Sequence, residues 1–184
     1  MINKFDYYYW PKMFSHNELL DLHSIFNTTQ DKNVFDEPAI NVTKISNVKF
    51  SKWSNLKNKL EKLEQYVLEA NQQYFGYNLW PQYDNNNLLL NEYDSKIKAE
   101  YDWHNDNSGS DIFDFKFTTL INTSIENYEG GEFNLFLNKP THIDKLDNPG
   151  DVVMFKSHLY HKVNTITSGK RHSITIFYKG PRFI

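Results

Sequence analysis

The sequence contains no cysteine, and only two of its 20 basic residues are arginine. The absence of cysteine excludes disulfides, thiolate zinc sites, iron–sulfur clusters and cysteine nucleophiles. Glycine and proline are few, at seven and six, and no apolar run approaches the ~20 residues that a membrane-spanning helix needs. Seven histidines are present. Any metal or catalytic site in this chain must therefore be built from nitrogen and oxygen donors.

Charge and size narrow the class of protein further. A length of 184 residues fits one domain with a sizeable core, so we expect a single domain over residues 1–184. The net charge of −3 argues against binding nucleic acid through a basic face. The N-terminal residues lack the pattern of a signal peptide. We therefore expect a cytoplasmic protein (in the host cytoplasm if a phage encodes it), with no membrane and no nucleic-acid partner.

The first half of the sequence contains two helix signals. Ser15 and Glu18 form a capping box before a short amphipathic stretch, which predicts a helix over 15–26. Apolar residues at three- and four-residue steps predict a second helix from about 54 to 74, which Gly76 would end. Residues 1–85 are therefore expected to form a helical support.

Short apolar segments separated by turn residues dominate after residue 85. The predicted strands cover residues 87–93, 115–121, 132–137, 151–155, 161–166 and 172–178. Helices followed by many short strands are typical of a β-sandwich or barrel with helices against it. We expect a mostly β protein whose core spans residues 86–184.

Two histidines and a carboxylate stand out near these strands. In an extended segment the side chains of His104 and Asp106 point to the same side, so they can converge on one ion. A turn and an apolar strand lead to His161, and Arg171 opens the last strand ten residues later. Two His and one carboxylate are the ligand set of non-haem Fe(II) oxygenases, and a guanidinium binds a carboxylate through two parallel hydrogen bonds.

The order of these motifs resembles that of the Fe(II)/2-oxoglutarate-dependent dioxygenases, in particular the prolyl 4-hydroxylase-like branch with its bacterial and phage members. The motifs, in order, are His104-Asn-Asp106, Gly130-Gly-Glu-Phe133, Pro149-Gly-Asp151, His161 and Arg171-His-Ser173. The resemblance covers roughly residues 88–181. It implies a double-stranded β-helix, the jelly-roll or cupin-like fold, with N-terminal helical support.

The resemblance also implies roles for individual residues. His104, Asp106 and His161 would bind Fe(II), and Arg171 would pair with the distal carboxylate of the co-substrate 2-oxoglutarate. Ser173 would lie beside it as a hydrogen-bonding neighbour. With O2 as oxidant and ascorbate as a supporting reductant, the expected activity is hydroxylation of a C–H bond.

Tyr93 matches a tyrosine that often lines the co-substrate pocket in this family. Residues 94–100 depart from the pattern, because they lack the glycine usually found between that tyrosine and the His-x-Asp pair. Lys156 stands where a proline is common. The substrate entrance is expected to involve residues 30–50 and 82–100.

Two alternative assignments concern the other histidines. His158 competes with His161 as the third metal ligand, and the ten-residue offset from Arg171 favours His161. His172 alternates away from Arg171 and Ser173, so we expect it to face outward. Trp103 fits a substrate-facing platform and a core position equally well.

Several functions remain open at this point. The main reading is a hydroxylase acting on a prolyl, other peptidyl or amino-acid substrate, so its partner is a peptide, a protein or a small molecule. The alternatives are a hydroxylase of a small metabolite and a non-catalytic metal- or ligand-binding module on the same scaffold. Nucleic-acid demethylation is disfavoured, because Arg171 is the only arginine of the last strand.

Overall fold

The computed structural model describes residues 5–29 and 44–182. In chain order, the elements are β1 (Tyr7–Trp10), α1 (His16–Thr29), β2 (Lys44–Ile45), β3 (Asn47–Lys52), α2 (Trp53–Ala70), the π-helical turn η1 (Asn71–Phe75), β4 (Asn87–Asp94), the 3-10 turn η2 (Ser95–Ile97), β5 (Glu100–His104), β6 (Phe113–Asn122), β7 (Tyr128–Gly130), β8 (Phe133–Phe136), β9 (Pro140–His142), the 3-10 turn η3 (Asp144–Leu146), β10 (Val152–Lys156), β11 (His161–Val163) and β12 (Ile166–Pro181). None of these helices is long and apolar enough to span a membrane.

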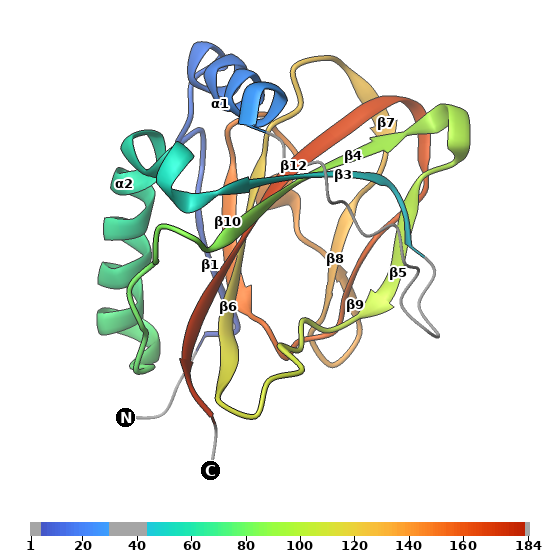
Figure 1. Cartoon of the computed structure of the whole chain (residues 1–184). Helices are drawn as coiled ribbons and strands as arrows, with labels where there is room; N and C mark the ends of the chain where they lie inside the picture. The colour runs from blue at the N-terminus through green and yellow to red at the C-terminus, as the bar shows by residue number, and fades with distance from the viewer. Residues whose placement is uncertain (1–4, 30–43, 183–184) are drawn as a thin grey trace.

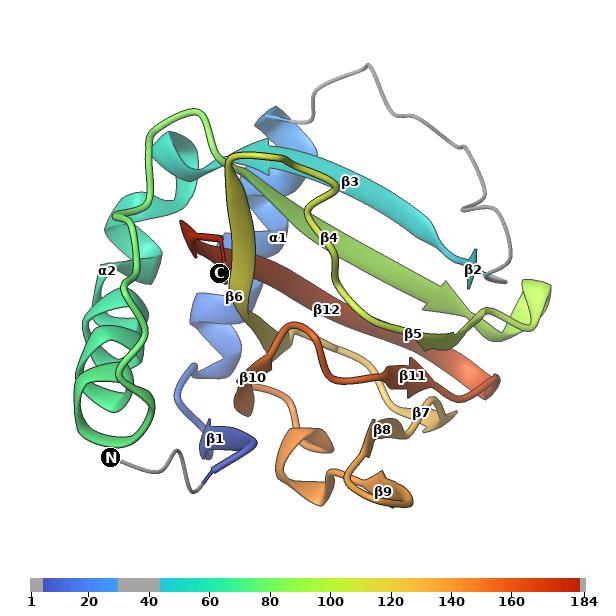
Figure 2. The same cartoon turned by 90° about the horizontal axis from the view of Figure 1, so that it is seen from below.

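The strands form two antiparallel sheets. The larger has the order β1-β10-β6-β12-β4-β3, with β7 also paired to β12, and the smaller has the order β2-β5-β11-β8-β9. The larger sheet lies between the two helices and the smaller sheet (Figures 1 and 2). This arrangement confirms the mostly β, jelly-roll fold expected from the sequence.

Alternation along β12 divides the larger sheet into two faces. Ile174, Ile176 and Tyr178 belong to the core that the sheet shares with α1 and α2. Ser173 and Thr175 point the other way, into a pocket between the sheets. The period of two along this strand therefore places polar side chains inside the fold while the helices cover the apolar face.

The two helices begin and end where the sequence signals place them. In the capping box the Glu18 carboxylate accepts a hydrogen bond from the Ser15 amide at 2.7 Å, and the Ser15 hydroxyl accepts one from the Glu18 amide at 3.4 Å. The predicted second helix consists of α2 and η1, and Gly76 ends it in the left-handed conformation at φ 75°. Both helix predictions are confirmed to within three residues.

The helical stripe of α2 leads to a stability prediction with an internal control. Leu60 is 0% exposed and Leu68, on the same helix, is 42% exposed. We expect Leu60→Ala to lower the free energy of unfolding by about 2–5 kcal/mol, because it leaves a cavity in the core. Leu68→Ala should change it by about 0.5 kcal/mol or less. Urea denaturation of both variants measures the difference, and equal effects would contradict the packing of α2.

The N-terminal half contains strands that the sequence analysis did not anticipate. Only helices were predicted before residue 86, whereas β1 pairs with β10, β2 with β5 and β3 with β4. The signal for β1 was present, since its four residues are three tyrosines and a tryptophan, which favour strands. The described residues before 86 thus extend both sheets as well as supplying the two helices. Residues 30–43 of the expected substrate entrance lie outside the described residues.

His172 faces away from Arg171, as expected from alternation, but the outer face of β12 is covered at this point. Its ring contacts that of His23 on α1, with the ring centroids 4.9 Å apart, and its Nε2 lies 3.2 Å from a Glu92 carboxylate oxygen. The expectation of an outward position was wrong in this respect, because helix α1 packs over that face of the sheet. His172 is therefore a packing residue beneath a helix.

Candidate metal centre

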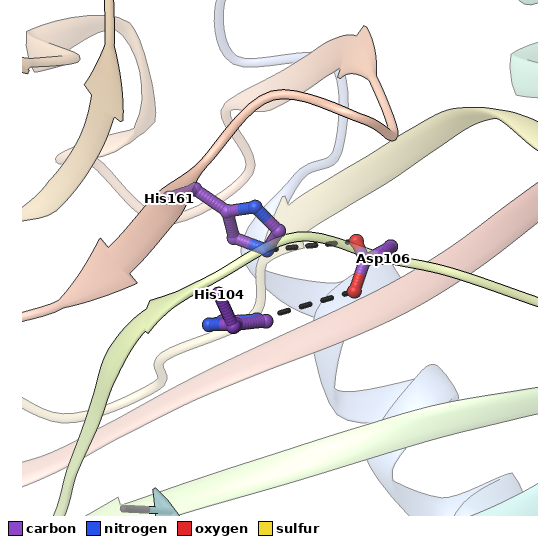
Figure 3. A group of neighbouring side chains, drawn as sticks. All are labelled: His104, Asp106 and His161. Atoms are coloured by element: carbon purple, nitrogen blue, oxygen red, sulfur yellow. Dashed lines mark ion pairs between the residues drawn. The ribbon is translucent and has the colours of Figure 1, made fainter. Parts of the chain in front are cut away.

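Three side chains from two distant parts of the chain meet in the pocket between the sheets. His104 is the last residue of β5 and His161 is the first residue of β11, and the two strands pair with these residues directly opposite each other. Asp106 follows His104 by two residues. Figure 3 shows the two imidazoles and the carboxylate pointing toward one another. The antiparallel register therefore closes the sequence gap of 57 residues between the two histidines.

The distances within this group suit a single small ion. One possible ligand atom from each residue lies within 4.8 Å of the others. The Nε2 atoms of His104 and His161 lie 3.9 and 3.5 Å from the two carboxylate oxygens of Asp106 (Figure 3). It is the only group of three or more such side chains at ligand spacing among the described residues.

The backbone fixes the orientation of both imidazoles. Nδ1 of His104 lies 2.7 Å from the carbonyl oxygen of Asp102, and Nδ1 of His161 lies 3.0 Å from that of Leu159. Because a carbonyl only accepts, each Nδ1 carries the proton and donates it. Each Nε2 is left with a free lone pair directed at the centre of the group, as in a metal-binding histidine.

Burial sets the charge state of the three side chains. It lowers the pKa of His161 to about 4, and burial together with the neighbouring His161 lowers the pKa of His104 to about 4. Both imidazoles are therefore neutral at pH 7, the form that binds metals. Burial also raises the pKa of Asp106, and the Thr118 hydroxyl, which donates to this carboxylate at 2.5 Å, opposes the shift. Two neutral imidazoles and a carboxylate leave coordination positions open on a divalent ion.

The lowered pKa values predict how the metal-free protein responds to acid. In the unfolded chain a histidine has a pKa of about 6.5, so between about pH 6.5 and 4 the unfolded state binds protons that the buried His161 does not. The free energy of unfolding should therefore fall with decreasing pH in this range, by about 3 kcal/mol from His161 alone. His161→Gln should remove this contribution, so urea denaturation at pH 7.5, 6 and 5 should favour the variant increasingly. A constant difference between the two proteins would contradict a buried neutral imidazole.

Two more of the predicted residues line the same pocket as the three candidate ligands. These are Tyr93 on β4 and Ser173 on β12. Burial raises the pKa of Tyr93 well above its usual range, so its hydroxyl stays protonated. Five of the six site residues expected from the sequence thus line one pocket, and the sixth, Arg171, is not among the lining residues but contacts Tyr93.

Arg171 is 1% exposed, and neither Nη1 nor Nη2 has a hydrogen-bond partner among the described residues. Arg171 pairs in register with Tyr93, and its guanidinium carbon lies 5.7 Å from the Tyr93 ring centroid. A buried guanidinium with two unpaired nitrogens is costly unless an anion completes it. The donor set and this unpaired cation together fit a divalent metal and a carboxylate co-substrate.

The structure also distinguishes between His158 and His161, the two alternatives for the third metal ligand. His158 is exposed and lines a neighbouring hollow with Asn107, Asp114 and Phe115. It is not part of the group at metal-ligand spacing. Trp103 lies outside the pocket lining, with its ring centroid 5.9 Å from that of Phe136.

Sequence reasoning missed several residues that line the pocket. They are polar or aromatic side chains on β2, β4, β5, β6 and β12, namely Lys44, Asn91, Tyr101, Thr118 and Thr175. The alternation of side chains along a strand could have identified Asn91 and Thr175, since they lie two residues from Tyr93 and Ser173. No sequence pattern indicated Lys44, because its strand has only two residues and its contacts are with residues far away in the sequence.

A comparison with protein families decides the membership of this chain. The sequence profile described as the 2OG-Fe(II) oxygenase superfamily matches residues 88–179, which is half of the chain and contains all six predicted site residues. The chain belongs to the 2OG-Fe(II) oxygenase superfamily. The resemblance drawn from the motif order is thereby confirmed, and Fe(II), 2-oxoglutarate and O2 are the cofactor and co-substrates that this membership brings with it.

A relative and several solved structures resemble this superfamily member. A PKHD-type hydroxylase from Crocosphaera subtropica is 36% identical over 90 residues, which cover 46% of this chain and 38% of that protein. The match therefore spans well under half of the relative. A Pseudomonas putida prolyl-4-hydroxylase superposes with a TM-score of 0.68 at 17% identity, over 98% of this chain and 95% of that one.

A second superposition involves a bound peptide in the other protein. A Trichoplax adhaerens prolyl hydroxylase, solved in complex with a peptide fragment of the hypoxia inducible factor oxygen degradation domain, superposes with a TM-score of 0.69 at 17% identity, over 96% of this chain and 84% of that one. At these identities the superpositions establish the shared fold.

Proposed function

We propose that this protein is an Fe(II)- and 2-oxoglutarate-dependent dioxygenase that hydroxylates a C–H bond of a prolyl, other peptidyl or amino-acid substrate. The observation that carries the proposal is the combination of three converging metal ligands in one pocket with a buried arginine that contacts the pocket residue Tyr93 and has two unpaired nitrogens. In the overall reaction one oxygen atom of O2 enters the substrate as hydroxyl. The other enters succinate, and CO2 leaves the co-substrate.

The residues of the chain divide this work between them. His104, Asp106 and His161 would hold Fe(II), which when bound supplies the activation of O2. Thr118 donates to the Asp106 carboxylate and Ser157 lies 3.0 Å from the Thr118 hydroxyl, so the carboxylate is held in one orientation. Such support of a ligand by surrounding hydrogen bonds is usual at metal sites.

The co-substrate end of the pocket would be formed by Arg171, Ser173 and Tyr93. The two free nitrogens of the guanidinium match the two oxygens of a carboxylate. The Ser173 hydroxyl lies on the same face of β12, two residues away. Phe133, Leu120 and Val163 line the pocket beside the metal ligands and would limit the access of water to the reacting centre.

The test is a turnover screen. Purified protein with Fe(II), ascorbate and 2-oxoglutarate is incubated with prolyl and other peptides and with free amino acids, and succinate and a substrate mass gain of one oxygen atom are measured together. We expect both products in equal amounts for an accepted substrate. Binding of 2-oxoglutarate without O2 consumption on any member of the screen would support a non-catalytic binding module instead.

A further inference from the structure

Lys44 places a cation in the pocket that the metal and the co-substrate do not use. It is the first residue of β2, which pairs with β5 at the edge of the smaller sheet (Figure 2), and its side chain lines the pocket with His104, Asp106 and His161. Its Nζ lies 4.9 Å from the ring centroid of Tyr101, and that ring stacks on His104 at 3.5 Å. Lys44 and the candidate metal ligand His104 thus contact the same aromatic ring.

Among the described residues, the hydrogen-bond partner of this ammonium group is neutral. Nζ donates to the side-chain oxygen of Asn91 at 3.1 Å, and among the described residues Lys44 forms no ion pair, although the charge of Asp106 acts on it at longer range. Asn91 in turn donates to the hydroxyl of Thr175 at 3.1 Å in a buried contact, which turns its amide oxygen toward Lys44. An ammonium group has three N–H donors. One of them is used by the amide oxygen of Asn91, so the others are available to a ligand in the pocket.

Lys44 keeps its charge in this position. Burial lowers the pKa of Lys44 to about 8, and the charge of Asp106 opposes the shift. Most of the molecules therefore carry an ammonium group at neutral pH. A partly buried cation with only neutral partners is stabilised when an anion joins it.

The charges of the groups expected at the pocket indicate which molecule would supply an anion to Lys44. With both groups bound, the two positive charges of the metal and the charge of Arg171 would be balanced by Asp106 and by the two carboxylates of 2-oxoglutarate. His104, Asp106 and His161 would hold the metal beside the carboxylate next to the keto group, and Arg171 would pair with the other carboxylate. The positive charge of Lys44 would then have no counterpart among these groups and the described residues, which leaves the molecule that is oxidised as its complement.

We propose that Lys44, held by Asn91 and Thr175, binds a carboxylate group of the hydroxylated substrate. This inference rests on the proposed function and names the substrate class as carboxylic acids. The carboxylate is the α-carboxylate of a free amino acid or the side-chain carboxylate of an acidic peptide. Because Lys44 and His104 share contact with Tyr101, the carboxylate and the oxidised carbon lie close together in the same small molecule or residue.

The first test compares acids with their amides. Free L-amino acids are assayed beside their primary amides, and N-acetylated, C-amidated peptides containing Asp or Glu beside the Asn and Gln versions. Substrate-dependent succinate and the mass gain are measured. We expect kcat/KM for the accepted acid to exceed that for its amide by about tenfold or more. The free amino acids and the capped peptides distinguish the two sources of the carboxylate.

Substitutions of two lysines test whether Lys44 is the residue that causes the preference for acids over amides. Lys44→Met should remove the preference for the acid, and Lys44→Arg should restore part of it. Lys49→Met is the matched control, because Lys49 on β3 also donates to an asparagine side chain, that of Asn27, outside the pocket. Equal use of acids and amides by the wild type would overturn the inference. So would a Lys44→Met variant that weakens the binding of 2-oxoglutarate while leaving the acid preference intact.

A binding measurement separates this inference from the proposed function. The same acids and amides are titrated by calorimetry into protein loaded with Mn(II) and 2-oxoglutarate without O2. Binding of acids that is lost in Lys44→Met, with no turnover of any compound, would support the carboxylate site and contradict the proposed activity. The absence of carboxylate-dependent binding would overturn the inference even if the protein hydroxylates another substrate.

Discussion

His161→Ala should abolish turnover and lower the affinity for a divalent metal by at least about 100-fold. Loss of a residue that only supports a metal ligand already costs 10- to 100-fold in affinity, and this variant removes a ligand itself. His104 and Asp106 alone would leave a two-donor site. Calorimetric titration with Mn(II) measures the affinity, and succinate release measures turnover. Alanine at this buried position also removes ring contacts with Phe133 and Phe155, so folding is checked by the thermal transition of each protein.

His158→Ala is the matched control, because it is the same substitution three residues away. His158 is exposed and lies outside the group at ligand spacing, so its variant should keep Mn(II) affinity and 2-oxoglutarate binding within about twofold. If His158→Ala lost the metal and His161→Ala retained it, the third ligand would be His158. The metal assignment drawn from both sequence and structure would then fail.

The candidate ligands could be predicted from the sequence because each depends on a local pattern. His104 and Asp106 share a side of one extended segment through the period of two. His161 follows an apolar strand and precedes Arg171 by a fixed offset. The structure adds what a local pattern does not contain, namely the register that sets His104 opposite His161 and the carbonyl groups that fix the protonated nitrogen of each ring.

The parts of the fold that were missed depend on long-range packing. His172 alternates correctly along β12, but whether its face meets solvent is decided by helix α1, which lies about 150 residues earlier in the sequence. Lys44 reaches the pocket only because its two-residue strand pairs with β5 and its side chain reaches Asn91 on β4. Periodicity assigns a side chain to a face of its element, whereas the pairing of elements decides what that face meets.

Arg171→Met should raise the concentration of 2-oxoglutarate needed for half-maximal turnover on the order of 100-fold, because a buried cation paired with a carboxylate is worth several kcal/mol to binding. Arg171→Lys should recover only part of this loss, since an ammonium lacks the planar fork that matches two carboxylate oxygens. Lys170→Met is the control: Lys170 is the adjacent cation on β12, and unlike Arg171 it is already paired, with Glu92 and Asp94. Calorimetry with 2-oxoglutarate and Mn(II) gives the same comparison without turnover.

The stability of the ligand-free protein distinguishes a binding role for Arg171 from a structural one. A structural arginine is held by partners, and its removal leaves them unsatisfied. Neither Nη1 nor Nη2 of Arg171 has a partner among the described residues, so Arg171→Met should leave the thermal transition of the ligand-free protein unchanged or raise it. 2-Oxoglutarate with Mn(II) should raise the transition of the wild type but not that of the variant, because only a state that binds the ligand is stabilised by it. A marked loss of stability with unchanged 2-oxoglutarate affinity would assign Arg171 to the core, because an arginine kept for ligand binding remains unpaired until the ligand arrives.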